Sequence, residues 1–538
     1  MAYVNTKAQS RTEKEAHLNW MGGPSFDITD PVVRLQIAAS SCFFGEPMYY
    51  QRDKSDKRPR REGGAGEAAL TDSDVDRLRE LLDATDPREW RTMAPAALLE
   101  SAIDAALDAN GEATLQLAGR LRNEDHIRVT PQVILVRAAN HKALKGTGLV
   151  RKYAPAIVKR ADEPATGLAY QLGAYGKDAP IPNSLKSAWA DALEHFDEYA
   201  LAKYRMEDHA VKLVDVVNLV RPKSEAVSKL VKGQLKTTDQ TWEAIISKEG
   251  STTEAWTKAI DVMGHMALLR NVRNLIQKEV PMDLFLDKLV EGVPKGKQLP
   301  FRYFAAYKAV GDGVSGRVKD AIEQCLEVSL GNLPRFSGRV MSLCDNSGSA
   351  WSATTSTMGT MHIAEIANLT ALISARRADD GYIGIFGDRL AVRDARKKTS
   401  IFADLDEACR VGKDIGQSTE NGIWLFWDKA IREKEHWDHV FVFSDMQAGH
   451  GGLYGSDTSA YRAYVWPGRH GGERYIDVPK LISKYRSAVN PNVNVYLVQV
   501  AGYQDTIVPE FYNRTYILGG WSEGLLRFAA KMAGVTQQ

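Results

Sequence analysis

The chain has 538 residues, of which 44% are hydrophobic and 25% are charged, and its formal net charge is +1. These proportions are those of soluble globular proteins, so they exclude a largely disordered chain. No apolar run approaches the roughly 20 residues that cross a bilayer, and the N-terminus lacks the regions of a signal peptide. We therefore expect a cytoplasmic protein of two or three folded units, with no membrane partner.

The chain is predicted to be helical up to about residue 334. Residues 51–66 are rich in Asp, Arg, Lys and Gly, which is typical of an exposed, mobile insertion. From residue 70 to about 330, apolar residues recur at three- and four-residue spacing, and Gly or Pro separates the segments. This pattern predicts many helices with short connections, as in an α-solenoid, without a strict sequence period. We interpret residues 1–334 as a helical-repeat module.

Two basic runs lie within this module. Residues 137–160 contain no Asp or Glu, and their basic residues are Arg137, Lys142, Lys145, Arg151, Lys152, Lys159 and Arg160. Residues 221–236 carry Glu225 as their one acidic residue, and their basic residues are Arg221, Lys223, Lys229, Lys232 and Lys236. Clustered positive charge attracts polyanions such as RNA, but charge blocks also form solvated helix faces. The sequence leaves both interpretations open.

Beyond residue 334 the pattern changes to short apolar runs that end in polar loops and alternate with helical segments. The runs are residues 340–344, 382–386, 439–443 and 493–498. Near-continuous apolar strands that alternate with helices predict a doubly wound parallel sheet, buried on both faces, over residues 335–538. Ligands bind beyond the carboxyl ends of the strands in such sheets. Two of these ends carry Asp345 and Asp445.

A divalent metal site is predicted at these strand ends. The loop Asp345-Asn346-Ser347-Gly348-Ser349 places one carboxylate and two hydroxyls at every second residue. Such oxygen ligands suit Mg²⁺, or alternatively Mn²⁺, and few carboxylates leave coordination positions for water or a partner's oxygen. Thr419, in the Gly-rich loop 415–422, and Asp445 are the expected further ligands. Ser418 is an alternative to Thr419.

Other interpretations of these motifs are weaker. A phosphatase of the haloacid-dehalogenase type needs Asp-x-Asp, where this chain has Ser347, and a serine hydrolase needs Gly-x-Ser-x-Gly. The sequences His450-Gly-Gly and His470-Gly-Gly are interpreted as loops. Residues 292–298 resemble a phosphate-binding loop, but the spacing is short and no Ser or Thr follows the lysine. We therefore predict that the protein is not an enzyme, and hydrolase remains the weakest alternative.

The four cysteines, Cys42, Cys325, Cys344 and Cys409, are far apart in the sequence and fit no CxxC zinc or redox spacing. We expect them to be buried thiols.

Two resemblances join these observations. Asp345, Ser347, Ser349, Thr419 and Asp445, in this order, resemble the metal-ion-dependent adhesion site of von Willebrand A domains, although Gln417 and Ser418 stand where that family usually has glycines. Several blocks of the helical part resemble the TROVE module of the Ro family of RNA-binding proteins: residues 181–186, 201–205, 216–223, 241–243, Trp256 and 266–275. A TROVE module followed by a von Willebrand A domain is the Ro architecture, so the resemblance covers nearly the whole chain.

The resemblance implies a ring of HEAT-like helical repeats closed by the A domain. It also implies that small noncoding Y RNAs bind on the outer rim and RNA ends in the central hole. Lys203 and Arg205 match the basic pair of the rim site. Leu219 replaces a histidine of the animal proteins, with Arg221 close by. Arg270 and Arg273 would line the hole or form structural ion pairs.

The predicted RNA-binding residues from the resemblance and the basic runs are Lys142, Arg151, Lys152, Lys203, Arg205, Arg221, Lys223, Arg270 and Arg273. Tyr153, Tyr170 and Tyr204 lie among basic residues and either stack on bases or pack in the core. We expect a non-catalytic protein that binds Y-type RNA and misfolded or 3′-ended structured RNA, and presents it to exoribonucleases in RNA quality control. The alternative is a metal-dependent protein-interaction module whose basic runs are only solvated.

Overall fold

The structure of the protein is a computed structural model. It describes residues 3–5, 17–18, 24–41, 95–125, 127–205, 211–235, 241–296, 298, 300–311, 313–331, 333–352, 362–395, 399–416, 420–444, 446, 465–467, 474–476, 478–500, 505–506, 514–519, 526 and 529.

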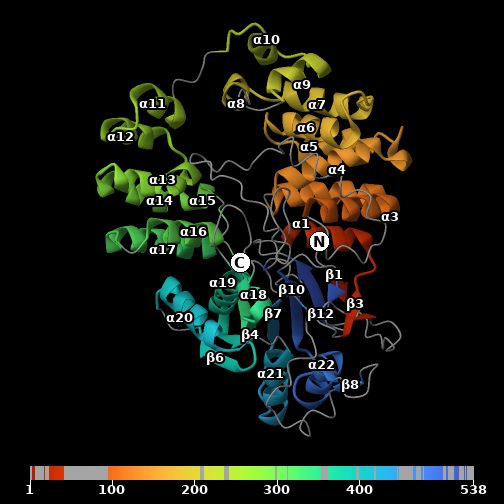
Figure 1. Ribbon diagram of the computed structural model, residues 1–538, viewed down its shortest axis with the longest axis vertical. Coiled ribbons are helices and arrows are strands. Elements are labelled where there is room, and N and C mark those ends of the chain that lie inside the picture. The colour runs from red at the N-terminus through yellow and green to blue at the C-terminus, as the bar shows by residue number, and fades with distance from the viewer. Residues whose placement is uncertain are drawn as a thin grey trace.

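The helical part forms an arch, and both of its ends meet an α/β domain, so that the two parts together outline a ring (Figure 1). One limb contains α3 (Pro95–Asn123), α4 (Val129–Asn140), α5 (Leu149–Ile157), α6 (Glu163–Tyr175), α7 (Asn183–Glu194), α8 (Glu198–Lys203), α9 (Leu213–Val220) and α10 (Glu225–Val231). The other contains α11 (Trp242–Glu249), α12 (Thr253–Val262), α13 (His265–Gln277), α14 (Leu286–Glu291), α15 (Val293–Gly296), α16 (Pro300–Val310) and α17 (Gly316–Leu330). Helix α5 packs between α3 and α7, while α4 packs on α6. The predicted array of helical repeats is confirmed.

The short helices begin where a small polar side chain caps them. Asp197, Ser224, Thr241 and Thr252 each accept a hydrogen bond from the backbone N–H three residues ahead. Each cap satisfies a donor that has no partner inside the helix, which contributes about 1 kcal/mol. Such caps explain how helices as short as α8 and α10 end and restart within the array.

A buried ionic cluster joins α3, α4 and α6. The guanidinium of Arg137 donates to the Tyr170 hydroxyl over 2.7 Å and to Oδ1 of Asp104 over 2.7 Å, and lies 3.3 Å from Oε1 of Glu100. The Tyr170 hydroxyl in turn donates to Glu100. Burial raises the pKa of Glu100, although Arg137 and Tyr170 oppose the shift. Arg137 therefore holds three helices together and is not part of a solvated face.

The α/β domain contains a seven-stranded sheet of order β1-β12-β10-β7-β4-β5-β6. Its parallel strands are β4 (Phe336–Asp345), β5 (Ala378–Phe386), β7 (His439–Ser444), β10 (Asn494–Gln499) and β12 (Thr515–Gly519), and the antiparallel edge strands are β1 (Tyr3–Asn5) and β6 (Leu390–Asp394). The helices are α18 (Gly348–Ser352), α19 (Ile363–Arg376), α20 (Ile401–Asp414), α21 (Glu420–Arg432) and α22 (Val478–Ala488). All four predicted strands are present.

Both faces of the sheet are covered. Phe441 and Phe443 of β7 belong to the core that contains α19 and α20. Val440 and Val442, which alternate with them, belong to the core that contains α21 and α22. Successive side chains of a strand point to opposite faces, so the apolar run of β7 reflects burial on both sides. The predicted doubly wound architecture is confirmed.

Residues 3–5 lie in the sheet, although residues 1–334 were predicted to form the helical module. Strand β1 pairs antiparallel with β12. Helix α1 (Pro31–Ser41) then packs against both β12 and α3. Leu35 belongs to the core shared with the helical part, whereas Ile37 belongs to the sheet core, where a Cβ at Gly519 would lie 2.6 Å from its Cα. This helix therefore joins the sheet to the first limb of the arch.

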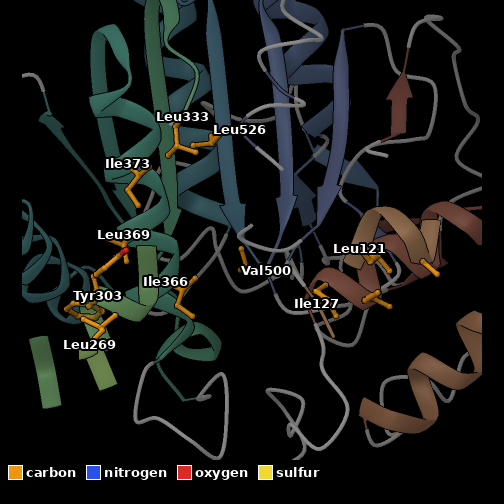
Figure 2. Packing of buried hydrophobic residues seen from close by; sticks show 14 of the residues in the cluster. Leu121, Ile127, Leu269, Tyr303, Leu333, Ile366, Leu369, Ile373, Val500 and Leu526 are labelled. Atoms are coloured by element: carbon orange, nitrogen blue, oxygen red, sulfur yellow. The ribbon is translucent and has the colours of Figure 1, made fainter. Parts of the chain in front are cut away.

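The second limb meets the domain at α19. Figure 2 shows Tyr303 of α16 and Leu269 of α13 packed close to Leu369 of α19. Next to them, the ring of Phe402 lies 4.2 Å from that of Tyr307. Figure 2 also shows Val500, which follows β10, at the end of the sheet that faces the helical part. The carboxyl ends of the strands, where ligands bind in such sheets, therefore face the helical repeats.

No helix in the described part of the chain is long and apolar enough to span a bilayer.

Candidate functional site

The predicted metal loop begins at Asp345, the last residue of β4. Parallel pairing with β5 sets Asp345 opposite Phe386. The carboxylate is fully buried, at 0% exposure. Its Oδ1 accepts a hydrogen bond from the backbone N–H of Ser347 over 2.8 Å, and its Oδ2 accepts one from the Ser444 hydroxyl over 2.6 Å. A buried carboxyl group needs such hydrogen bonds to offset the loss of water, so these two donors hold Asp345 in place.

The two serine hydroxyls of the loop lie together at the start of α18. The hydroxyl oxygens of Ser347 and Ser349 are 3.0 Å apart. Ligands at 2.0–2.1 Å from an octahedral Mg²⁺ lie about 3 Å from their neighbours, so this separation fits two adjacent ligands. The backbone N–H of Trp351 donates to the Ser347 carbonyl over 3.2 Å, in the first turn of α18, which follows Ser347 and contains Ser349. Asp345, Ser347 and Ser349 therefore form an oxygen donor set suited to a hard divalent cation.

The other predicted ligands, Thr419 and Asp445, lie outside the described residues, as does Ser418. Their described neighbours approach the loop. Ser444, which precedes Asp445, contacts Asp345 directly. A Cβ at Gly412, in the helix before residue 419, would lie 1.9 Å from Oδ1 of Asn346. Ser444 of β7 and Gly412 of α20 therefore lie beside the metal loop.

Sequence reasoning missed Ser444, Asn346 and Asn368. Ser444 carried a usable signal, because it is a polar residue at the carboxyl end of a buried strand. Asn346 lies inside the motif but between its ligand positions. Asn368 lies in the middle of α19, and nothing in its local sequence distinguishes it from other helical polar residues. Its amide hydrogen bonds to Asn346 appear only when α19 packs on the loop.

The thiols beside the loop are protonated at neutral pH. Burial raises the pKa of Cys344 well above its usual value, with smaller effects from Cys409 and Asp345. Burial also raises the pKa of Cys409 to about 11. Cys325 and Cys344 are buried and Cys409 is half-buried, as expected, while Cys42 lies outside the described residues. Among the described residues no three His, Cys, Asp or Glu side chains gather into a metal-binding group.

Two of the predicted RNA-binding residues are paired with acidic side chains of neighbouring helices. Arg151 of α5 forms a two-pronged contact with Asp191 of α7, at 2.5 and 2.9 Å. Lys152 donates to Glu112 of α3 over 2.9 Å. Both pairs are exposed, so their contribution to stability is small. Their positive charges are nevertheless compensated locally, which the sequence did not reveal because each acid lies about 40 residues away.

Lys203 and Arg205, predicted as a pair, have different environments. Lys203 is exposed, and its Nζ lies 5.8 Å and 5.6 Å from the ring centres of Tyr199 and Tyr204. Arg205 is half-buried, and its guanidinium donates to the backbone carbonyl of Leu235 over 3.0 Å. The structure therefore gives Arg205 a role inside the repeat array and leaves Lys203 available at the surface.

The remaining predicted residues are exposed: Lys142, Arg221, Lys223, Arg270 and Arg273. None of their side chains forms an ion pair with another described residue. Arg221 ends α9 in a left-handed conformation, with φ of 49°. Arg270 and Arg273 lie one turn apart on α13, so they share one face of the helix. These cations are free to meet an anion from outside.

Of the two interpretations of Tyr170, packing in the core is the one that the structure confirms. Its ring is 0% exposed, and its hydroxyl lies within the Arg137 cluster, where Glu100 comes from a helix 70 residues earlier. Tyr153 is half-buried and donates to Glu112 over 2.7 Å. The Tyr204 ring is covered by the guanidinium of Arg160 at 4.3 Å.

The glycines of the phosphate-loop-like segment have a packing role. Gly292 and Gly296 lie against the ring of His265 in α13, and a Cβ at Gly296 would lie 2.2 Å from Cδ2 of that ring. His265 is itself held by the Leu289 carbonyl and the Tyr303 hydroxyl, each at 2.9 Å. Close helix packing therefore accounts for both glycines. His450 and His470, of the two His-Gly-Gly sequences, lie outside the described residues.

Comparison with known proteins supports this arrangement. Residues 234–342 match the model of the TROVE domain family. This range contains α11 to α17 and three of the predicted TROVE blocks, those at 241–243, Trp256 and 266–275. A search of the curated proteins found no match.

Among solved structures, the chain is similar to one titled "Crystal structure of Deinococcus radiodurans RO (RSR) protein". The two are 15% identical, the match covers 94% of this chain and 100% of the other, and the TM-score is 0.51. At this identity the likeness establishes the fold, namely helical repeats together with an α/β domain. Residues 234–342 of the chain therefore match the TROVE domain family, and the chain shares its fold with this bacterial Ro protein.

Proposed function

We propose that this protein binds RNA on its helical repeats. The observation that carries the proposal is the set of exposed cations without an acidic partner among the described residues: Lys142, Lys203, Arg221, Lys223, Arg270 and Arg273. They lie in the same array of helices whose later part matches the TROVE domain model. Uncompensated Lys and Arg side chains neutralise phosphates and release counterions, which is the main source of affinity for nucleic acid.

The expected RNA is small and structured, of the Y type. Helices cannot enter the narrow major groove of A-form RNA, so exposed cations on helix surfaces contact the backbone and read shape. Arg151 and Lys152 contribute less than the residues above, because Asp191 and Glu112 already compensate their charges. Misfolded RNA with a free 3′ end is the second proposed ligand class, and Arg270 and Arg273 are its proposed contacts.

We assign the α/β domain a divalent cation, Mg²⁺ or Mn²⁺, held by Asp345, Ser347 and Ser349, with Thr419 and Asp445 as further ligands. A cation there would offer a coordination position to an oxygen of a binding partner. The chain's own contribution is to hold the buried carboxylate of Asp345 between two donors, the backbone N–H of Ser347 and the hydroxyl of Ser444. The site faces the helical repeats, so a partner bound to the cation would lie next to them.

The protein acts without catalysis in this proposal. It captures RNA in the cytoplasm and presents it to exoribonucleases in RNA quality control. Purified protein that degrades RNA by itself in the presence of Mg²⁺ would contradict this part.

The second candidate function is a metal-dependent protein-interaction module without specific RNA binding. The buried oxygen donor set favours it, because the set does not require RNA. The two functions respond differently to salt and to chelators. Contacts to phosphates weaken steeply as salt rises, whereas binding of a partner's carboxylate to the cation is lost when a chelator removes the cation.

The testing experiment is to recover the protein from its own cells, wash it at moderate salt and sequence the RNA that remains. Enrichment of one small structured RNA, released at higher salt, would support the proposal. RNA at background level, with proteins that leave on addition of a chelator, would overturn it in favour of the interaction module.

A further inference from the structure

Helix α19 is bonded to the metal loop through a pair of buried asparagines. Asn346 lies between Asp345 and Ser347, and its amide forms a reciprocal pair with Asn368 of α19. Nδ2 of Asn346 donates to Oδ1 of Asn368 over 2.8 Å, and Nδ2 of Asn368 donates to Oδ1 of Asn346 over 3.0 Å. The two side chains are 1% and 0% exposed. The loop is thus tied to a helix that supplies none of the predicted metal ligands.

The place of Asn346 is also determined by its other contacts. Its Nδ2 donates to the Cys344 carbonyl over 3.1 Å, and its backbone N–H donates to the Phe386 carbonyl over 2.8 Å. On the side of α20, the backbone of Gly412 packs directly against the Asn346 amide, because a Cβ on Gly412 would lie 1.9 Å from Oδ1 of Asn346. These contacts fix the position of the Asn346 amide. They thereby also fix the backbone of the neighbouring residues, Asp345 and Ser347.

Packing alone does not explain two buried amides at this position. An amide taken out of water costs free energy unless its hydrogen bonds are replaced, and an apolar side chain would fill the same space without that cost. What the amide pair adds is direction, since each hydrogen bond requires a particular orientation of its partner. The oriented segment is the one that carries Asp345 and Ser347.

We infer that Asn368 is a positioning residue for the divalent cation, acting through Asn346 to hold Asp345 and Ser347 at the spacing that the cation requires. Groups that orient the ligands of a metal site without touching the metal contribute about 10- to 100-fold to its affinity. The inference rests on the metal part of the proposed function and is independent of RNA binding.

The chain offers a matched control on the same helix and strand. Ser374 of α19 and Ser342 of β4 have hydroxyl oxygens 2.8 Å apart, and both side chains are 0% exposed. This pair joins α19 to β4 as the asparagine pair does, but it lies before the loop. Its loss would loosen the helix without turning Asp345 or Ser347.

The experiment compares Asn368→Leu and Ser374→Ala in the full chain. The affinity for Mn²⁺ is measured by electron paramagnetic resonance and that for Mg²⁺ by calorimetry, with the denaturation midpoint of each metal-free protein. Asn368→Leu is expected to weaken the binding of both cations about 10- to 100-fold. Ser374→Ala is expected to lower the denaturation midpoint and to leave the affinity for both cations unchanged. Asn368→Ser, a milder change, serves if the leucine variant does not fold.

Unchanged affinity in Asn368→Leu, or in the folded Asn368→Ser variant, would overturn the inference. So would an equal loss of affinity in Ser374→Ala, because general loosening would then explain the effect. If the unaltered protein binds neither cation, the inference and the metal part of the proposal both fall. If that same protein still binds RNA in a salt-sensitive manner, the RNA-binding proposal holds independently of the metal site.

Discussion

Ser444, at the end of β7, donates its hydroxyl hydrogen to Oδ2 of Asp345, at the end of β4, over 2.6 Å. Its own oxygen accepts a hydrogen bond from the backbone N–H of Met446 over 3.0 Å. One serine thus orients the carboxylate of the predicted metal site and the first turn of the chain beyond β7. The ends of these two neighbouring strands are therefore joined by a buried polar contact.

Ser444→Ala is expected to lower the free energy of unfolding by about 1–3 kcal/mol, because it leaves a buried carboxylate short of one donor. Urea denaturation measures this. Ser487→Ala is the control, since Ser487 is exposed and bonds only the nearby Lys484 carbonyl over 2.9 Å. Equal small effects of the two substitutions would contradict the role given to Ser444.

Asp345→Ala is expected to abolish bound Mg²⁺ or Mn²⁺, because it removes the one carboxylate of the predicted set that the structure describes. Metal content after dialysis against Mn²⁺ is the measurement. Asp379→Ala, at an exposed position of β5, should retain the metal. Unchanged stoichiometry in Asp345→Ala would place the ligands elsewhere.

Lys203→Gln and Arg205→Gln should separate binding from stability. Lys203→Gln is expected to weaken RNA binding and to reduce the slope of log K against log salt by roughly 0.7–0.9, with an unchanged unfolding midpoint. Arg205→Gln should lower stability by about 1 kcal/mol or more, because it loses the hydrogen bond to Leu235. Titration of RNA at several salt concentrations, beside urea denaturation, tests both. Unchanged affinity in Lys203→Gln would move the RNA site away from α8.

Paired and unpaired cations should differ in their effect on RNA. The double substitution Arg270→Gln with Arg273→Gln removes two uncompensated charges and is expected to weaken binding of RNA with a free 3′ end. Arg151→Gln with Asp191→Asn removes an ion pair without changing the net charge, so affinity should hold. Equal losses of RNA affinity in the two variants would show that the RNA does not bind the uncompensated charges of α13.

His439 makes the sheet sensitive to acid. Burial lowers its pKa from 6.5 to about 4, with Asp438 opposing the shift. Between these values the unfolded chain binds a proton that the folded chain does not, so stability falls as the pH drops, by on the order of 3 kcal/mol in all. His439→Gln should flatten this dependence, as measured by urea midpoints at pH 7 and pH 4.5. If the variant keeps the full dependence of stability on pH, titratable groups other than His439 cause it.

The parts of the fold that sequence predicted are those with a local signature. The strands around residues 340–344 and 439–443 were recognisable because burial on both faces makes them apolar throughout. The candidate metal loop could be predicted because Asp345, Ser347 and Ser349 recur at every second residue after a buried strand. The caps of the short helices are likewise Ser, Thr or Asp at the expected place.

The rest depends on contacts between distant parts of the chain. Tyr170 stands among basic residues in the sequence, but its partner Glu100 lies 70 residues earlier and draws it into the core. The compensation of Arg151 by Asp191 is invisible for the same reason. Asn368 acquires its importance only from the packing of α19 on Asn346. Local pattern therefore predicted the candidate ligands but not the residues that position them.

Strand β1 and helix α1 also have a consequence for the order in which the protein is made. Residues 3–5 pair with β12, which begins at Thr515, so β1 has no partner until β12 has been synthesised. At about 5–20 residues per second, that wait is on the order of half a minute to two minutes. Until then Ile37 has no sheet edge to cover. Nascent and truncated chains therefore expose an apolar helix, and the ring closes as a late step of biosynthesis.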